Sequence, residues 1–303
     1  MIALYLWGIG IVLALQAMGS PALDGFFLAV TQLGGEEFVL LLVPLVYWCL
    51  DKRFGIRLAY VFLFSSLINI WLKAMFNTPR PFQYDSRVRL IGPEETNPGF
   101  PSGHAQSVTT VWGMLAVRAR RGGVWALAIV LIAFVALSRM YLGVHFPHDV
   151  IGGVVYGAIV LLIFTGIEPL VSPRFAALST GAQIALALVA PLALLIVFLS
   201  RDSVSAAAVL SGMSIGFVMQ RRWANFSVSG SNGQRALRFI LGMVGVFALY
   251  FGLRIAFGAL AREEETALWY VLRFVRYALV GVWAGGLWPM MAVRLKLAAK
   301  AEG

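Results

Sequence analysis

Long apolar segments follow one another along almost the whole chain, separated by short connections that carry the charges. Only 13% of the 303 residues are charged and 60% are hydrophobic, whereas a soluble domain has about 25% charged residues. Runs of this kind, many close to the length of a bilayer-spanning helix, predict an all-α, polytopic membrane bundle. Nine segments are candidate spans: 38–50, 58–76, 101–117, 124–137, 150–167, 182–199, 204–219, 239–257 and 267–293.

The first apolar segment, 2–18, has two interpretations. Its length is at the lower limit for a membrane span. Small residues around Ala17 and Gly19 would also suit the cleavage site of a signal peptide, but the basic start of such a peptide is missing, because the first Lys or Arg is Lys52. The sequence therefore predicts nine or ten spans.

The connections between segments differ in charge. Those at 52–57 and 118–121 and the tail at 294–300 are basic, whereas the alternate set carries acids at 36–37 and 263–265. The positive-inside rule places the basic set in the cytoplasm. The net charge of +10 thus reflects membrane topology, and we expect no nucleic-acid partner. The single Cys49 excludes an intrachain disulfide.

Three polar phrases interrupt the apolar pattern, and all fall on the side opposite the basic connections. A single basic residue at the end of a span is usually a topology signal or a snorkelling anchor, but a charged, His-rich stretch between membrane-length segments is costly unless it does chemistry. The phrases are Lys73-x6-Arg80-Pro81, Pro101-Ser102-Gly103-His104 and Ser138-Arg139-x5-His145-x3-Asp149. Their convergence predicts one site on the extracytoplasmic face of an inner or plasma membrane.

The chemistry of these phrases favours an anion with several oxygens. Lys73, Arg80 and Arg139 offer one compact and two planar cations, which suit a phosphoryl group. Pro101, Ser102 and Gly103 are typical of a helix start, where free N–H groups also attract phosphate. Asp149 follows His145 by four residues, so its carboxylate can orient the imidazole.

The three phrases resemble the signature of the type 2 phosphatidic acid phosphatase superfamily, which shares its site with the vanadium haloperoxidases. The motifs cover about residues 73–149. The resemblance implies a six-helix catalytic core at 1–168, followed by a C-terminal extension at 169–303 with three to four further transmembrane helices. The extra spans, and the phrase 141–148, look similar to the glucose-6-phosphatase and sphingosine-phosphate phosphatase branches.

The resemblance also implies a role for each residue. His145 attacks phosphorus and forms a phosphohistidine, Asp149 orients and stabilises its ring, and His104 protonates the leaving oxygen and later activates water. The implied phosphate-binding residues are Lys73, Arg80, Ser102, Gly103 and Arg139. We expect no cofactor and no metal, because three cations already neutralise the phosphate and the nearby acids do not form a typical Mg²⁺ cage.

Three further residues are candidate substrate contacts. His148 lies beside the motif but has no role in it, and hydrogen bonding behind the site is the alternative. Arg273 and Arg276 interrupt the last apolar segment. Pairing with Glu263–Glu265 or with lipid headgroups would explain both arginines without a substrate.

Three functions are compatible with this pattern. The favoured one is a membrane phosphatase that hydrolyses a lipid phosphate or diphosphate. The second is the same chemistry on a soluble sugar phosphate, or transfer of the phosphoryl group to an acceptor other than water. The third is a transporter or binding protein that uses the cations without catalysis, which the complete set of nucleophile, acid and carboxylate disfavours. We expect lipids as partners, and the oligomeric state stays open.

Overall fold

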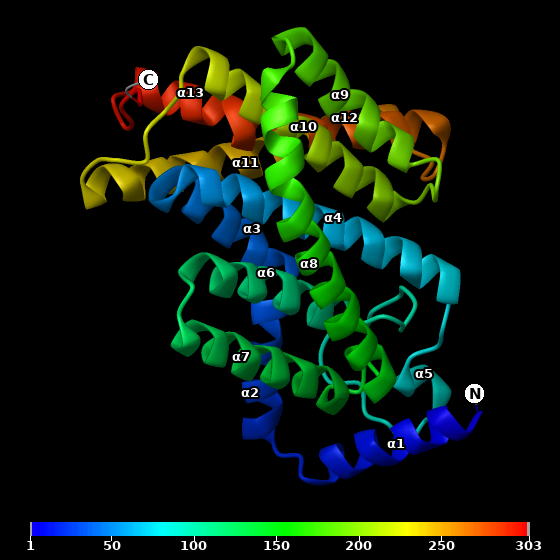
Figure 1. The fold of residues 1–303 in the computed structure, drawn as a ribbon. Helices are drawn as coiled ribbons and strands as arrows, with labels where there is room; N and C mark the ends of the chain where they lie inside the picture. Colours follow the sequence, from blue (N-terminus) through cyan, green and yellow to red (C-terminus); the bar gives the residue numbers. More distant parts are fainter. Residues whose placement is uncertain (1, 302–303) are drawn as a thin grey trace. The chain divides into compact units, whose positions relative to one another are not determined.

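The computed structural model describes residues 2–301 and confirms the all-α prediction (Figure 1). Within this range no strand forms, apart from an isolated antiparallel bridge between Phe226 and Lys300. The helices of the N-terminal half are α1 (Ile2–Ala17), α2 (Pro21–Thr31), α3 (Glu36–Leu45), α4 (Lys52–Phe76), α5 (Pro81–Tyr84), α6 (Gly103–Ala119), α7 (Gly122–Tyr141) and α8 (Pro147–Ala177). Those of the C-terminal half are α9 (Thr180–Leu194), α10 (Arg201–Trp223), α11 (Asn232–Leu260), α12 (Ala267–Val282) and α13 (Trp288–Arg294).

Three short helical turns join these helices: a 3₁₀ turn η1 (Gln32–Gly34) and two π-helical turns, η2 (Val46–Leu50) and η3 (Trp283–Leu287). Hydroxyl side chains fix the start of several helices. Ser102, Ser179 and Ser231 each accept a hydrogen bond from a backbone N–H in the first turn, which satisfies a donor that the helix itself cannot pair. The predicted loop 77–100 contains the four-residue helix α5, which begins at Pro81.

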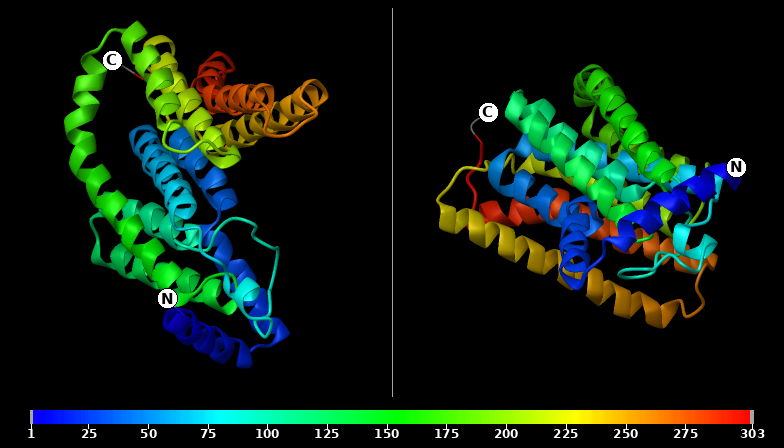
Figure 2. Two further views of the ribbon diagram at one scale, coloured as in Figure 1. Left: turned by 90° about the vertical axis from the view of Figure 1, so that its right-hand side faces the viewer. Right: turned by 90° about the horizontal axis from the view of Figure 1, so that it is seen from below.

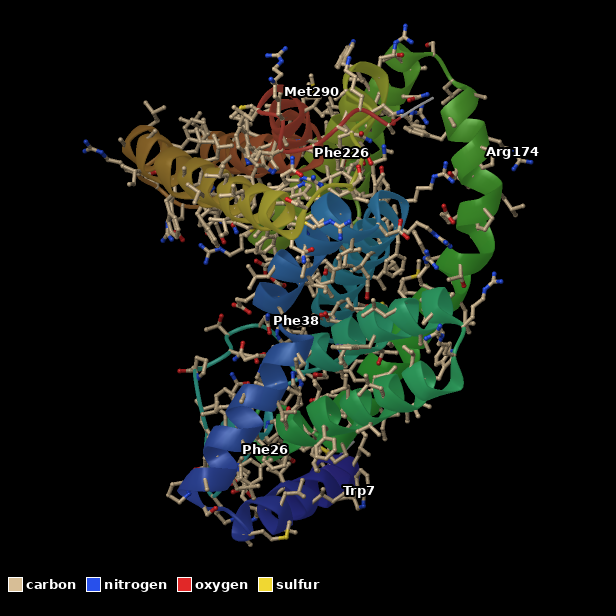
Figure 3. All side chains as sticks on the ribbon, turned by 90° about the vertical axis from the view of Figure 1, so that its left-hand side faces the viewer. Trp7, Phe26, Phe38, Arg174, Phe226 and Met290 are labelled. Atoms are coloured by element: carbon tan, nitrogen blue, oxygen red, sulfur yellow. The ribbon has the colours of Figure 1, made fainter. Side chains whose placement is uncertain are left out.

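Six helices of the described chain are long and apolar enough to cross a membrane: α4 with α5, α7, α8, α10, α11, and α12 with α13. A seventh span results if the bent pair Pro21–Gly34 and Glu36–Leu50 counts as one. The predicted segments 2–18 and 182–199 form apolar helices, α1 and α9, of 16 and 15 residues. Large apolar side chains such as Trp7 and Phe26 are about half exposed, as expected of a lipid-facing surface (Figure 3).

The chain divides into two compact units. The first comprises Met1–Leu41 and Phe64–Gly166, and the second comprises Leu42–Leu63 and Ile167–Gly303. The predicted boundary between residues 168 and 169 is a division by function, between a catalytic core and an extension. The two compact units are a division by packing, so the functional boundary stays a prediction.

In the first unit, α6 and α7 form an antiparallel pair joined at Arg120 and Arg121 (Figure 1). The loop that follows α7 is packed between two apolar clusters. Phe146 belongs to the cluster around Val12, and Val144 to the cluster around Phe27, which brings α1 and α2 against this loop. The apolar packing therefore fixes residues 142–146, the segment that contains His145.

In the second unit, small residues allow α10 to approach α12 and η3 closely. A Cβ built on Gly216 would lie 2.6 Å from the backbone N of Gly286, so no larger residue fits without separating the helices. α11 and α12 form a hairpin in the same unit (Figure 2). The buried Arg238 donates hydrogen bonds to the carbonyls of Trp48, Ser229 and Leu297, which ties the C-terminal tail to this unit.

Candidate active site

Four helix ends of the first unit meet at one place. Lys73 lies in the last turn of α4, Ser102 caps the start of α6, Arg139 lies in the last turn of α7, and Asp149 lies in the first turn of α8. Arg80 caps the short helix α5. The structure thus brings together phrases that lie far apart in the sequence, and the contacts below connect them.

The ring of His145 is held from both sides. Its Nδ1 lies 3.4 Å from Asp149 Oδ2, and its Nε2 lies 3.2 Å from Arg80 Nη1. A guanidinium only donates, and Oδ2 already accepts a hydrogen bond from the Phe146 N–H at 2.9 Å. The neutral tautomer with its proton on Nδ1 satisfies both neighbours, so the lone pair of Nε2 points to Arg80.

Asp149 also connects His145 to the start of α6. The backbone N–H of Ser102 donates to the backbone carbonyl of Asp149 at 2.9 Å. Asp149 is completely buried, and its other carboxylate oxygen lies 3.3 Å from His148 Nε2. One residue therefore positions the nucleophile candidate and the Pro-Ser-Gly-His phrase together.

Polar residues of α4 and α6 support the start of α6 from behind. Asn69 donates from its amide to the carbonyl of Pro101 and to Gln106, and Gln106 donates to Ser65. All three side chains are buried. This network was not predicted from the sequence, although polar residues in the middle of the apolar segments 58–76 and 101–117 were a signal for it.

The three predicted cations are buried, and each contacts the loop 85–100. Lys73 donates from Nζ to the carbonyl of Pro98, and Arg80 donates from Nε to the carbonyl of Asn97 at 2.8 Å. Arg139 donates to Thr31 Oγ1 at 2.9 Å and forms an ion pair with Glu95. The side chains of Arg80 and Arg139 are 0% and 4% exposed. Buried charges of this kind require a partner.

That partner is Glu95, a residue that the sequence analysis did not single out. Its carboxylate pairs with Arg139 and lies 2.7 Å from Arg80 Nη2. Oε2 lies 4.0 Å from Nε2 of His145. The signal was present as an acidic pair, Glu94-Glu95, a few residues before the Pro-Ser-Gly-His phrase.

The electrostatics of the loop residues agree with this geometry. Burial lowers the pKa of His145 well below its usual range, and the charges of Arg80, Lys73 and Arg139 lower it further, with His104 also contributing. His145 is therefore neutral at neutral pH. Burial opposes ionisation of Glu95, but the charges of Arg139 and Arg80 outweigh it and lower the pKa of Glu95 to about 2.

His104 lies in the first turn of α6 and is partly buried. A positive charge on His104 would lower the pKa of both Glu95 and His145, so its ring lies near both groups. Gly103 precedes it, and a Cβ at this position would lie 3.3 Å from Asn69 Oδ1. The backbone at the helix start is therefore packed closely against Asn69 of α4.

The remaining predicted residues have other surroundings. Ser138 donates to the carbonyl of Val135 at 2.6 Å and is buried. His148 stacks on Phe146 with ring centres 5.2 Å apart. Arg273 and Arg276 belong to the second unit, where their guanidinium groups lie over Trp269, Tyr250 and Tyr277. The roles of His148, Arg273 and Arg276 as substrate contacts stay predictions.

The donor set of the site is cationic. Residues 2–301 contain no group of three or more His, Cys, Asp or Glu side chains that could hold a metal ion. The groups that converge are three cations, two imidazoles and two carboxylates, one of which is already paired with arginines. Such an arrangement can bind a multiply charged oxyanion beside a neutral imidazole.

Comparison with known proteins identifies the family. Residues 54–173 match the PAP2 superfamily, and residues 204–300 match the transmembrane extension of PAP2 superfamily phosphatases. The chain belongs to the PAP2 superfamily. The resemblance seen in the three phrases is thereby confirmed, including the presence of an extension after the shared domain.

Relatives of the chain include several phosphatases. The chain is 31% identical over 136 residues to the undecaprenyl-diphosphatase of Sulfolobus acidocaldarius. This alignment covers 44% of this chain and 66% of that protein. It is 25% identical to glucose-6-phosphatase 3 of Mus musculus over 91% of this chain and 89% of that protein. The first relatives are matched over only 40–66% of their own length.

A solved structure is also similar. It is that of a transmembrane PAP2 type phosphatidylglycerolphosphate phosphatase from Bacillus subtilis, with 25% sequence identity and a TM-score of 0.48. The match covers 56% of this chain and 88% of that chain.

Proposed function

We propose that this integral membrane protein is a phosphatase that hydrolyses a lipid phosphate or diphosphate through a phosphohistidine intermediate. The observation that carries the proposal is the position of His145, a neutral imidazole oriented by Asp149 and in contact with the buried Arg80, which shares the carboxylate of Glu95 with the buried Arg139. A nucleophile, the group that orients it and the charges that stabilise its product are thus in contact.

In the first half of the reaction, Nε2 of His145 attacks phosphorus and the bond from phosphorus to the alcohol oxygen breaks. His104 gives its proton to that oxygen, so the alcohol leaves neutral. The arriving phosphate dianion favours the protonated form of His104, because it adds negative charge beside the ring. Asp149 stabilises the positive charge that develops on the ring of His145.

In the second half, His104 accepts a proton from a water molecule whose oxygen attacks the phosphohistidine. The bond between phosphorus and Nε2 breaks, and His145 returns to its neutral form. Lys73, Arg80 and Arg139 hold the equatorial oxygens in both transition states. The N–H groups of Gly103 and His104 add further donors, because they lie in the first turn of α6, whose N–H groups have no partner within the helix.

We place the site on the extracytoplasmic side of the membrane. The support is the charge pattern of the connections, which puts the basic set at 52–57, 118–121 and 294–300 in the cytoplasm. The ends of α4 and α7 and the starts of α6 and α8 that form the site lie on the opposite side in this assignment. A site at the membrane surface would be accessible to a lipid headgroup from within the bilayer.

A soluble sugar phosphate is the second candidate substrate. The observation that favours it is the alignment with glucose-6-phosphatase 3, which extends over 91% of this chain and thus includes the C-terminal spans. The presence of Asp149 mildly favours a lipid substrate, since the glucose-6-phosphatase pattern need not keep a carboxylate there. Transfer of the phosphoryl group to a lipid alcohol instead of water would use the same first half-reaction, in which the phosphohistidine forms.

Release of inorganic phosphate from a panel of substrates tests the proposal. Purified protein in detergent should hydrolyse phosphatidate, a polyprenyl diphosphate or a sphingoid phosphate at least tenfold faster than glucose 6-phosphate. Preference for glucose 6-phosphate would support the second candidate. No phosphate release from any member of the panel, by folded protein, would contradict both.

The chemistry also predicts the response to chelators and to vanadate. EDTA should leave the rate unchanged, because side-chain cations and not a metal neutralise the phosphate. Orthovanadate should inhibit competitively with the phosphate ester substrate, because it adopts the trigonal-bipyramidal geometry of the transition state. Steady-state rates with and without each compound measure both effects. Loss of activity on chelation, reversed by added Mg²⁺, would indicate a metal-dependent mechanism.

Close packing of α8 against α6 predicts a long-range effect on the rate. A Cβ built on Gly153 would lie 2.5 Å from the carbonyl oxygen of Ser102 and 2.9 Å from Ala105 Cβ. Alanine there must displace the start of α6, and displacements near 1 Å cost about 10²-fold in rate. We therefore expect Gly153→Ala to lower kcat by about 10²-fold. Gly166→Ala on the same helix meets no atom within 4 Å and is the matched control.

A further inference from the structure

The loop before α6 supplies oxygen atoms to all three cations of the site. Glu95 contributes its carboxylate to Arg80 and Arg139, Asn97 contributes its side-chain and backbone oxygens to Arg80, and Pro98 contributes its carbonyl to Lys73. The substrate phosphate needs the same N–H donors. In the described state, the loop therefore occupies several of the N–H donors that would bind the substrate, although Arg139 Nε has no hydrogen-bond partner within residues 2–301.

The carboxylate of Glu95 lies where an attacked phosphoryl group would have to lie. It contacts both guanidinium groups, and its Oε2 is 4.0 Å from the Nε2 that we propose as the nucleophile. A phosphorus atom in line for attack would stand about 3–3.5 Å from Nε2. The carboxylate and a phosphate cannot occupy this volume together, so Glu95 must leave before a substrate reacts.

We propose that Glu95 is a built-in competitor that determines which anions can occupy the site. The proposal rests on the proposed function, because it assumes that the site binds a phosphate monoester. Displacement of Glu95 raises the apparent Kd of every anion by the same factor, since only the fraction of molecules with an open site can bind. Singly charged phosphodiesters bind weakly, so this factor removes them from the site.

The same factor is tolerable for a phosphate monoester. A dianion gains more from Arg80, Arg139 and Lys73 than the single charge of Glu95 does, because each added charge interacts with three buried cations. A membrane surface presents phosphodiester headgroups in large excess over monoesters. Without Glu95, a pocket with three cations would be occupied by these headgroups.

The geometry also gives Glu95 the means to leave. Its side chain is 27% exposed, whereas the arginines it contacts are almost fully buried. It lies in the irregular segment between α5 and α6, which contains three prolines and two glycines. Movement of the loop therefore exchanges one anion for another at fixed cations.

Binding of inorganic phosphate to the full-length protein in detergent tests the proposal without any turnover. Isothermal titration of Glu95→Gln should show about tenfold or more tighter binding than the unmutated protein. The matched control is Glu94→Gln, which changes the adjacent, exposed acid and should bind phosphate as the unmutated protein does. Equal or weaker binding by Glu95→Gln would overturn the proposal, because a residue that only stabilises the loop has no reason to weaken anion binding.

Two further measurements keep the test independent of folding and of activity. The midpoint of thermal unfolding of Glu95→Gln should rise more on addition of phosphate than that of the unmutated protein. If Glu95→Gln does not fold, Glu95→Asp keeps the charge with a shorter reach and should bind phosphate more tightly than the unmutated protein. An affinity equal to that of the unmutated protein would overturn the proposal. Failure of the proposed function would appear differently, as folded protein that binds phosphate but releases none from any ester.

The selectivity for anions has its own measurement. Mixed micelles containing phosphatidylglycerol should inhibit Glu95→Gln competitively and should leave the unmutated protein and Glu94→Gln unaffected at the same concentration. Inhibition of all three proteins to the same degree would contradict a role of Glu95 in excluding phosphodiesters.

Discussion

Replacement of His145 by asparagine is expected to lower kcat for phosphate release by at least about 10⁴-fold, the scale on which loss of a nucleophile acts in covalent enzymes. His145 is the group whose Nε2 contacts Arg80 and whose Nδ1 contacts Asp149 Oδ2, and no other imidazole has this position among the described residues. An asparagine amide occupies a similar volume, so the fold should persist. The rate of phosphate release and the midpoint of thermal unfolding measure the two effects separately.

His148→Asn is the comparison for this variant, because it removes the neighbouring ring of the same phrase. His148 Nε2 faces Asp149 Oδ1, on the oxygen that does not contact His145. We expect a loss of less than about tenfold. Equal losses in the two variants would mean that the effect comes from packing around Asp149 and not from a nucleophile.

A covalent intermediate makes the prediction sharper. With an aryl phosphate labelled in the phosphoryl group, the leaving group needs no proton, so His104→Asn should still form the phosphoenzyme but hydrolyse it slowly. The label should therefore accumulate on His104→Asn and should be absent from His145→Asn. A label that persists on His145→Asn would assign the nucleophile to another residue.

The sequence predicted the cationic part of the site because its chemistry is unusual in a membrane. A single cation near the end of an apolar segment usually anchors the helix at the interface, so Lys73 alone would indicate little. Its combination with Arg80, Arg139 and the two histidine phrases indicated a function. Alternation of sides along the chain then predicted that they share one face. In the structure, Arg80 and Arg139 both pair with the carboxylate of Glu95, and Lys73 donates to the carbonyl of Pro98 in the same loop.

Glu95 could not be predicted in the same way, because an acid in a polar loop costs nothing until the loop folds back. Its contacts depend on the path of residues 85–100, which no periodicity determines. The buried amides of Asn69 and Gln106 are similar, since their role depends on how α4 packs against α6. Residues that act through tertiary contacts leave a weaker trace in the sequence than residues whose charge is itself exceptional.

The spans were predicted by hydropathy, which detects composition but not helix length. The segments 2–18 and 182–199 have the expected composition, yet α1 and α9 are only 16 and 15 residues long. Phenylalanine, leucine and valine give the same hydropathy in a short helix as in a spanning one. The lengths follow from where the chain turns, and Ser20 and Ser179, which cap α2 and α9, set two of those turns.

Replacement of Asp149 by asparagine is expected to lower kcat on the order of 10³- to 10⁴-fold while the fold persists. Oδ2 of Asp149 is the atom that contacts both the Phe146 N–H and Nδ1 of His145, so an asparagine with its amide oxygen at this position can keep both contacts, and the backbone carbonyl still accepts from Ser102. The neutral amide no longer stabilises the positive charge that develops on the ring of His145 when Nε2 attacks phosphorus.

The effect should appear in kcat more than in KM, because Arg80, Arg139 and Lys73 still bind the phosphate. Asp85→Asn provides the matched control, because Asp85 pairs with the exposed Arg87 at the start of the loop 85–100. The same chemical change there should leave kcat and KM within about twofold. Asp149→Ala should also lose thermal stability, since it leaves the Phe146 N–H unpaired.

The two variants of Asp149 thus separate orientation from structure. If Asp149 only stabilises the loop, Asp149→Asn should retain nearly full activity and Asp149→Ala should lose activity in proportion to its lost stability. If the negative charge of Asp149 stabilises the ring of His145 in the transition state, both should be inactive although only one is destabilised. Activity retained by Asp149→Asn would therefore remove the charge of the carboxylate from the reaction and leave Arg80 as the charged group in contact with the ring.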